Sequence, residues 1–265
     1  MTRDPASPLI EIDGEAATVA TLAPALGGYG HFTAMQVRDG RVRGVGFHLA
    51  RLDAATRELF GAELDGERVR AFVRHALGSA GRTDASVRVY VFPSDDAPGA
   101  PVAVMVKVGA PAHAAGGPYR LKSVPYQRPV AHLKHLGGFA QRYHVRQVEA
   151  EGYHEALLTG PDGTIAEGAV TNVGFIEGDT VVWPEAPLLR GVTLQVLERR
   201  LGEAGIAQTS RPVRLADIPG YQGVFVGNSR GVVPVESVDA TSVPTGAELL
   251  KRIGEVYESA PWDAL

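Results

Sequence analysis

The chain has 265 residues, a formal net charge of -4 and no cysteine. This length fits one large domain or two smaller ones, and the lack of cysteine excludes disulfides, thiolate nucleophiles and zinc–cysteine sites. The arginines are scattered among acidic residues, and no run approaches the roughly 20 apolar residues of a membrane-spanning helix. We therefore expect neither nucleic acid nor a membrane as partner, and predict a cytoplasmic protein that binds a small molecule.

The first 118 residues are predicted to form a small N-terminal α+β domain. Runs of β-branched residues predict strands, and apolar residues at helical spacing between the second and third strands predict two amphipathic helices. The strands are expected at residues 9–14, 32–38, 86–92 and 102–108, and the helices around residues 49–60 and 69–77.

Residues 119–130, rich in proline and polar residues, are predicted to connect the two domains, and residues 131–265 to form a larger C-terminal domain. In the connection and beyond it, strands are expected at residues 119–124, 155–159, 171–176, 180–183, 224–226 and 232–235, and helices at residues 139–149, from about 193, and near the C-terminus. Thr245 lies three residues before Glu248, which favours a capping box at the start of the last helix. That helix is expected to bury Leu249, Ile253 and Val256.

Lysine is scarce in this chain, which draws attention to each one that is present. Only Lys107, Lys122, Lys134 and Lys251 occur among the 26 basic residues. A guanidinium does not deprotonate in proteins and cannot form an imine, so arginine replaces lysine only where a plain positive charge is needed. A surface position is the ordinary expectation for any single lysine. Lys134, in the stretch His-Leu-Lys-His-Leu, is distinguished by the motifs around it.

Three other motifs supply groups that would suit a phosphorylated aldehyde cofactor. Arg51 lies in a His-x-x-Arg-Leu pattern, Glu167 stands five residues before Asn172, and Val192 and Thr193 open a predicted helix. A lysine can form an imine with the aldehyde of pyridoxal 5'-phosphate, and a carboxylate can pair with its ring nitrogen. A helix N-terminus and an arginine can bind its phosphate.

From about Gly27 to Asp239, the order and spacing of these motifs resemble the class IV pyridoxal-phosphate enzymes. This group includes branched-chain and D-amino-acid aminotransferases, (R)-amine transaminases and aminodeoxychorismate lyase. The resemblance implies an α+β, two-domain fold of type IV, similar to D-amino-acid aminotransferase, with the cofactor in the interdomain cleft, and a homodimer. It also implies Lys134 as the catalytic Schiff-base residue, and a cofactor-binding set of Arg51, Lys134, Glu167, Asn172, Val192, Thr193 and Ser229.

Three positions depart from the branched-chain pattern. Leu194 stands where the family usually has arginine, and Phe139 stands where the branched-chain enzymes have tyrosine. Thr33, after Phe32, matches the lyase more than the aminotransferases. Thr33, Arg88 and Arg230 are the candidate substrate-binding residues, although for both arginines a surface or structural role is at least as good an explanation.

The predicted function is a pyridoxal-phosphate-dependent aminotransferase that uses an amino donor and a keto acid. One alternative is a lyase similar to aminodeoxychorismate lyase, and another is a non-catalytic protein that binds the cofactor. No metal is expected, because the spacing of His132, His135 and His144 fits no usual zinc motif. The glycines at 27, 28 and 30 are followed by no Walker lysine, so nucleotide binding is not predicted.

Overall fold

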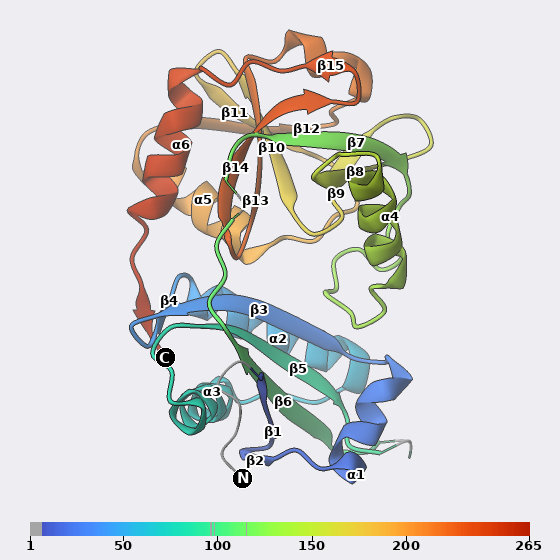
Figure 1. Cartoon of the computed structure of the whole chain (residues 1–265), viewed down its shortest axis with the longest axis vertical. Helices are drawn as coiled ribbons and strands as arrows, with labels where there is room; N and C mark the ends of the chain where they lie inside the picture. The colour runs from blue at the N-terminus through green and yellow to red at the C-terminus, as the bar shows by residue number, and fades with distance from the viewer. Residues whose placement is uncertain (1–6, 96, 98, 115) are drawn as a thin grey trace. The chain divides into compact units, whose positions relative to one another are not determined.

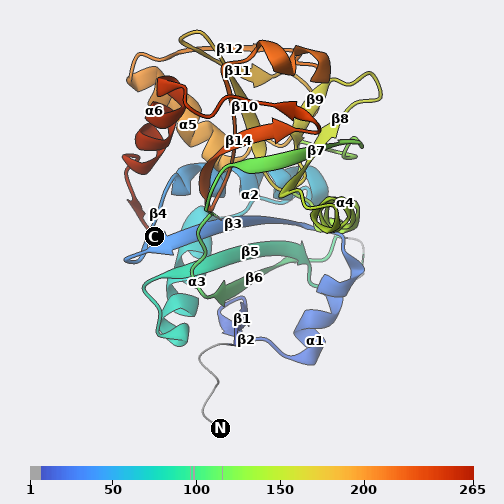
Figure 2. The same ribbon diagram turned by 45° about the horizontal axis from the view of Figure 1, so that its top comes forward.

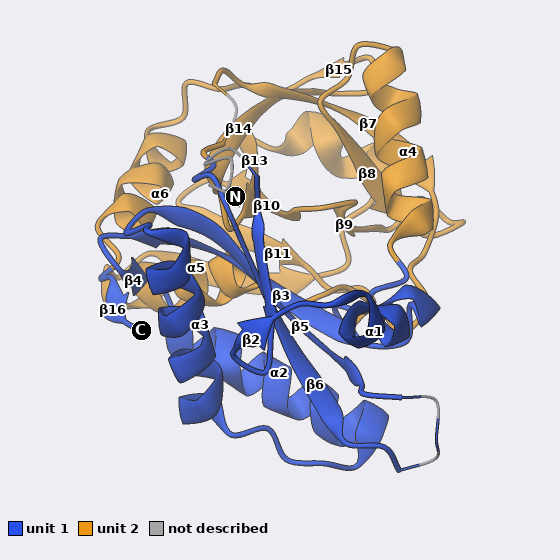
Figure 3. Ribbon diagram, turned by 60° about the horizontal axis from the view of Figure 1, so that its bottom comes forward, with its two compact units in different colours: residues 1–112, 133–137, 261–265 blue, residues 113–132, 138–260 orange. Residues whose placement is uncertain are grey.

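The computed structural model describes residues 7–95, 97, 99–114 and 116–265, which divide into two compact units. Unit 1 contains Met1–Ala112, Leu133–Gly137 and Pro261–Leu265, and unit 2 contains His113–His132 and Gly138–Ala260 (Figure 3). This division differs from the one drawn from the sequence in a functionally relevant way. The Lys134 segment, assigned above to the C-terminal domain, belongs to unit 1.

Unit 1 is built on an antiparallel sheet with the strand order β16-β4-β3-β5-β6-β1-β2. Its strands are β1 (Leu9–Ile12), β2 (Glu15–Ala16), β3 (His31–Arg38), β4 (Arg41–Val42), β5 (Ala85–Pro93), β6 (Val102–Gly109) and β16 (Asp263–Ala264). Its helices are α1 (Val19–Leu22), the 3-10 helix η1 (Ala23–Gly27), α2 (Val45–Phe60) and α3 (Gly66–Ala80).

The core of unit 1 follows from the period-two alternation along β3 and β5. Met35 and Val37 on β3, together with Val87 and Val89 on β5, belong to one buried cluster that includes apolar residues of α2 and α3. Figure 1 shows these two helices beside the sheet. Successive side chains of a strand point to opposite faces. The helices therefore cover the face that carries the odd-numbered residues of β3, and α2 brings the predicted phosphate-binding Arg51 to that face.

The C-terminal residues contribute directly to the start of α2. Strand β16 pairs with β4, and the Asp263 carboxylate accepts a hydrogen bond of 3.0 Å from the backbone N–H of Val45, the first residue of α2. Gly44, at the N-cap of α2, makes no side-chain cap of its own. A residue more than 200 positions away thus supplies an acceptor that a local Ser or Asp usually provides.

Unit 2 is built on a mixed sheet with the order β12-β11-β10-β13-β14-β7-β8-β9, and β15 pairs with β14. Its strands are β7 (Tyr119–Pro125), β8 (Glu155–Thr159), β9 (Ile165–Gly168), β10 (Asn172–Glu177), β11 (Thr180–Pro184), β12 (Ala207–Arg211), β13 (Gly223–Asn228), β14 (Gly231–Val238) and β15 (Thr241–Ser242). Its helices are α4 (Phe139–Ala150), α5 (Val192–Glu203), the 3-10 helix η2 (Leu215–Gly220) and α6 (Glu248–Glu258).

Parallel pairing in this sheet joins segments that are distant in sequence. Strand β7 runs parallel to both β14 and β8, and Figure 2 shows β7 beside β14 although more than 100 residues separate them. Strands β9 and β13 are each followed by a short turn, residues 169–171 and 229–230, and polar residues described below lie in or beside these turns.

Most predicted elements are confirmed, but the last helix is not as expected. Helix α6 starts after Ala247, which makes no side-chain cap, so the predicted capping box from Thr245 is wrong. Leu250, Ile253 and Tyr257 are its buried residues. The predicted set of buried residues is partly wrong, because this helix carries two neighbouring rows of apolar residues and both rows have helical spacing. Strands β9 and β12 were not predicted. Of the helices in the described part of the chain, none is long and apolar enough to cross a membrane.

We predict that Asp263→Ala lowers the free energy of unfolding by about 1 kcal/mol, because the first N–H of α2 loses its acceptor. Urea denaturation monitored by circular dichroism would measure this. Asp263→Asn, which keeps an oxygen acceptor, is the matched control and should lose clearly less. Equal losses in the two variants would show that the carboxylate does not act as a cap.

Candidate active site

Lys134 lies in a short segment that is fixed against the beginning of β3. The N–H of Phe32 donates to the carbonyl of Lys134 over 2.9 Å, and the N–H of Leu136 donates to the carbonyl of Gly30 over 2.9 Å. The Lys134 ammonium lies 4.9 Å from the centroid of the Phe32 ring, a cation–π arrangement. The backbone of the lysine is therefore held by main-chain pairing inside unit 1, and an aromatic ring supports its side chain.

Arg51 lies on α2 and is joined to β3 by a chain of polar contacts. Its Nη2 donates a short hydrogen bond to the Thr33 hydroxyl, which is also 2.6 Å from Nδ1 of His48. Thr33 and His48 are buried. The Nε of Arg51 is buried as well and has no hydrogen-bond partner within the described residues. An unsatisfied charged donor in such a place costs free energy unless a ligand satisfies it.

The groups around Arg51 do not offset its charge. Burial lowers the pKa of Arg51 to about 10, which still leaves it charged at neutral pH. Burial first, and then the charges of Arg51 and Lys134, lower the pKa of His48 well below its usual value. Burial and then Arg51 lower the pKa of His31 to about 4. Both imidazoles are thus neutral at pH 7, and unit 1 presents a guanidinium and an ammonium that suit an anionic ligand.

Glu167 lies on β9 and is almost fully buried, at 5% exposure. One carboxylate oxygen accepts a hydrogen bond of 2.9 Å from Nη1 of Arg128, and the other accepts one of 3.2 Å from the backbone N–H of Leu189. The same Arg128 nitrogen donates to the carbonyl of Ala131 over 2.9 Å. A buried carboxylate needs such donors to offset the cost of its desolvation.

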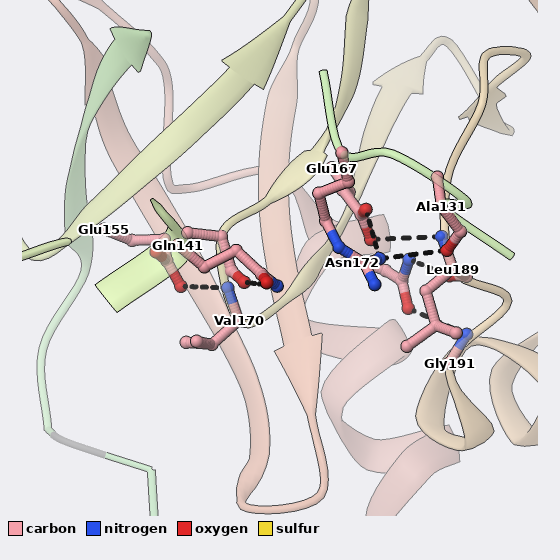
Figure 4. Close-up of polar contacts among 10 residues, drawn as sticks. Ala131, Gln141, Glu155, Glu167, Val170, Asn172, Leu189 and Gly191 are labelled. Atoms are coloured by element: carbon pink, nitrogen blue, oxygen red, sulfur yellow. Dashed lines mark hydrogen bonds and ion pairs between the residues drawn. The ribbon is translucent and has the colours of Figure 1, made fainter. Parts of the chain in front are cut away.

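Asn172, the first residue of β10, fixes the approach to helix α5. Its Nδ2 donates to the carbonyl of Leu189 over 2.8 Å, and its Oδ1 accepts from the N–H of Gly191 over 3.2 Å (Figure 4). A Cβ at position 191 would lie 2.2 Å from that oxygen, so only glycine fits there. Gly191 is the N-cap of α5 and makes no side-chain cap, which leaves the first N–H groups of α5 available to a ligand.

The predicted residues divide between the two units. Unit 1 holds Thr33, Arg51, Arg88 and Lys134, and unit 2 holds Glu167, Asn172, Val192, Thr193, Ser229 and Arg230. Within unit 1, Arg51 donates a hydrogen bond to Thr33. Within unit 2, Glu167 and Asn172 both bond the backbone of Leu189, in the loop before α5.

The other predicted residues vary in exposure. Thr193 is buried at the start of α5, whereas Ser229 and Arg230 lie in the turn between β13 and β14, with Arg230 exposed. Arg88 is exposed on the β5 face that α2 and α3 do not cover, opposite to the face on which Thr33 lies.

Two residues that the sequence analysis did not assign to the site belong to these networks. Arg128 pairs with Glu167, but its sequence context, between two prolines, does not distinguish it from a linker arginine. His48 contacts Thr33, and its only sequence signal is its place three residues before Arg51 in the His-x-x-Arg pattern.

A second buried carboxylate, Glu155 on β8, lies near the turn that follows Glu167. Burial raises the pKa of Glu155 to about 7, and this increase is partly offset by hydrogen bonds from the N–H groups of Ala156 and Val170, by the charge of Arg230 and by the Thr171 hydroxyl. Near neutral pH this carboxyl is therefore about half protonated.

The sequence matches the family Amino-transferase class IV over residues 30–238, which is most of the chain. The chain belongs to the class IV aminotransferase family, so the family predicted from the motifs is confirmed. The predicted fold of type IV is also confirmed, because 95% and 94% of this chain superimpose on two solved aminotransferases.

Two solved structures illustrate the similarity in fold. A hypothetical aminotransferase from Mycobacterium tuberculosis, in a PLP-bound form, has a TM-score of 0.82 at 22% identity, over 95% of this chain and 98% of that one. A branched-chain aminotransferase from Thermoproteus uzoniensis, with norvaline, has a TM-score of 0.83 at 18% identity, over 94% and 93%. A probable branched-chain-amino-acid aminotransferase of Rickettsia felis is 31% identical over 36% of this chain. That match spans about a third, 33%, of the relative's length.

We predict that Glu155 makes the stability of the protein fall between about pH 4.5 and pH 7. In this window the folded state keeps a proton that the unfolded state releases, so raising the pH favours unfolding. Above pH 7 the loss is complete, and its total size is roughly 3 kcal/mol or less. Urea titrations of the protein and of Glu155→Gln would measure this at several pH values. The difference in unfolding free energy between the two should change inside the window and stay flat on either side; a constant difference would contradict the prediction.

Proposed function

We propose that this protein is a pyridoxal-phosphate-dependent aminotransferase that exchanges an amino group between an amino acid or amine and a keto acid. The observation that carries the proposal is the arrangement around Glu167. A buried carboxylate, held by Arg128 and by the Leu189 N–H, stands five residues before Asn172, which fixes the N-cap of α5. Membership of the class IV family supports the same conclusion.

The residues present suit pyridoxal 5'-phosphate. Arg51 offers a buried Nε without a partner among the described residues, and a phosphate oxygen is the kind of acceptor that it lacks. Helix α5 offers backbone N–H groups at Val192 and Thr193, where its dipole also favours an anion. Ser229 adds a hydroxyl in the β13–β14 turn. The proposal assigns these groups, together with Lys134, Glu167 and Asn172, to one cofactor.

When bound, pyridoxal phosphate supplies an aldehyde that condenses with amines and a ring that accepts an electron pair from the substrate Cα. Lys134 would bind the aldehyde carbon through its amine and, once displaced by the substrate amine, would move the proton from Cα as a general base. Glu167 would accept a hydrogen bond from the ring nitrogen and keep that nitrogen protonated. Arg128, by pairing with Glu167, would keep its carboxylate oriented for this contact.

The aminotransferase is favoured over the lyase by the surroundings of Thr33 and by the exposure of Arg230. The lyase-like residue, Thr33, has its hydroxyl engaged by His48 and Arg51, which gives it a role in holding the phosphate-binding arginine. Arg230 has an exposed guanidinium in the turn that follows β13, where it would pair with the carboxylate of an amino or keto acid.

We further propose that two copies of the chain associate. Phe139 and Tyr143 on α4 are 80% and 50% exposed, with their rings stacked at 6.2 Å between centroids. Exposed aromatic side chains that lie together are typical of protein contact surfaces. A cytoplasmic location is proposed as well, since free amino acids and keto acids are substrates available there.

The first test concerns Lys134. Incubation of the purified protein with pyridoxal 5'-phosphate, followed by borohydride, should produce a stable adduct that peptide mass mapping places on Lys134. Lys134→Arg should keep the charge and lose the adduct, because a guanidinium does not condense with the aldehyde. Lys122→Arg is the matched control and should retain it. An adduct on Lys107, Lys122 or Lys251 alone, or no adduct, would contradict the proposed function.

The second test separates transamination from elimination. Protein loaded with the cofactor and given an amino donor alone should release about one keto acid per active site and then stop until a keto acid is added. A lyase would instead release pyruvate from aminodeoxychorismate over many turnovers without any keto acid. Quantifying keto acid released per site, with Lys134→Arg as the inactive control, measures the difference. Repeated pyruvate release, with no single-turnover reaction on any amino acid tested, would assign the lyase.

A further inference from the structure

Glu155 is a buried acid that the mechanism above does not use. It is 2% exposed, on β8 of unit 2. One carboxylate oxygen accepts the N–H of Ala156 over 2.9 Å. The other accepts the N–H of Val170 over 3.3 Å and the hydroxyl of Thr171 over 3.4 Å. Only a carboxylate can accept at both oxygens without presenting a donor of its own, so a carboxylate suits this set of donors better than an amide.

The turn that Glu155 holds, residues 169–171, lies between the two proposed cofactor residues Glu167 and Asn172. Its other backbone groups are also bonded: the Ala169 N–H to the carbonyl of Ala156 over 2.9 Å, and the Ala169 carbonyl to Nε2 of Gln141 over 3.0 Å. Figure 4 shows Glu155 and Gln141 converging on this turn, with Glu167 and Asn172 beyond it.

The turn packs closely on the end of β9. A Cβ at Gly168 would lie 2.0 Å from the Thr171 hydroxyl oxygen and 3.2 Å from Cγ of Glu155. A side chain at position 168 would therefore displace Thr171, and the turn lies directly against the backbone next to Glu167. This close approach joins the Glu155 contacts to the strand end that carries Glu167.

The same turn is connected to the loop that carries the candidate phosphate and substrate residues. Nδ2 of Asn228 donates to the carbonyl of Val170 over 3.2 Å, and Oδ1 of Asn228 accepts the N–H of Arg230 over 2.9 Å. The turn at Val170 thus supports the β13–β14 turn. Ser229 lies in that turn, between Asn228 and Arg230.

We propose that Glu155 is a positioning residue, whose buried carboxylate fixes the turn at residues 169–171 and thereby sets the positions of Glu167, Asn172 and the β13–β14 turn. This inference rests on the proposed function of those residues. Without the carboxylate, the N–H groups of Ala156 and Val170 lose their common acceptor, and the turn moves to find others. Burying a carboxylate costs stability, as the raised pKa of Glu155 indicates, so its presence is better explained by what it orients than by stabilisation.

The test compares Glu155→Gln with Glu11→Gln at pH 8. Glu11 is also buried and accepts a hydrogen bond of 2.9 Å from Nδ1 of His75, but it lies on β1 of unit 1. Three quantities are measured: the dissociation constant of pyridoxal 5'-phosphate, the rate of the single-turnover reaction with an amino donor, and amide hydrogen exchange of the cofactor-free protein. All are measured at a temperature where circular dichroism shows each variant folded.

For Glu155→Gln we expect faster hydrogen exchange in residues 165–172, an increase of about threefold to tenfold in the dissociation constant and a rate about tenfold lower. Glu11→Gln should leave all three unchanged. A structural role alone would lower the melting temperature of the cofactor-free protein in both variants and leave cofactor affinity and rate at their original values, and that result overturns the inference. Failure of the proposed function is distinct, because the unaltered protein would then form no Lys134 adduct.

A milder pair of variants decides the matter if Glu155→Gln does not fold. Thr171→Val removes only the hydroxyl that donates to Glu155, and Thr171→Ser restores it. Thr171→Val should lower the single-turnover rate about twofold to fivefold, and Thr171→Ser should recover most of it. Identical rates for both variants and the unaltered protein would overturn the inference.

Discussion

The candidate site of unit 2 depends on the buried ion pair between Glu167 and Arg128. Each side chain would be costly to bury alone, and the pair makes two further hydrogen bonds, from the N–H of Leu189 to Glu167 and from Arg128 to the carbonyl of Ala131. These contacts tie strand β9, the approach to α5 and the segment that precedes Lys134 to a single carboxylate. A neutral amide at position 167 would keep the shape and lose the charge that attracts Arg128.

The polar network of unit 1 is centred on the positive charge of Arg51. Arg51 is held by a neutral network, Thr33 and His48, instead of by a carboxylate, and desolvation lowers the pKa of both His31 and His48 so that they add no further charge. A guanidinium that is already paired with a carboxylate would bind an external anion more weakly, because the carboxylate neutralises its charge. Neutral partners orient the fork and leave its charge for a ligand, which is the arrangement expected of a phosphate-binding arginine.

Much of this could be predicted from the sequence, because hydrophobic periodicity and short motifs are local signals. Most strands of the two sheets, helices α2 to α5 and the family followed from such signals, whereas β9 and β12 did not. Arg128, Glu155 and Asp263 did not, because each acts on residues that are near only after folding: Glu167, the Val170 turn and Val45. The placement of Lys134 in unit 1 has the same cause. Its segment pairs with Gly30 and Phe32, about 100 residues earlier.

At the two turns of unit 2, the residues that bond the backbone differ from the exposed residues. Asn172 and Asn228 each donate a side-chain amide hydrogen bond to a backbone carbonyl, and Glu155 is buried. In contrast, Arg230 is exposed, and the N-cap of α5, Gly191, makes no side-chain cap. The buried acids Glu155 and Glu167 thus hold backbone groups of the turn after β9 and of the approach to α5. Phe139, exposed at the start of α4, and Leu194, buried on α5, depart from the branched-chain pattern. Neither is among the Glu167 contacts described above, so these contacts do not require the branched-chain residues.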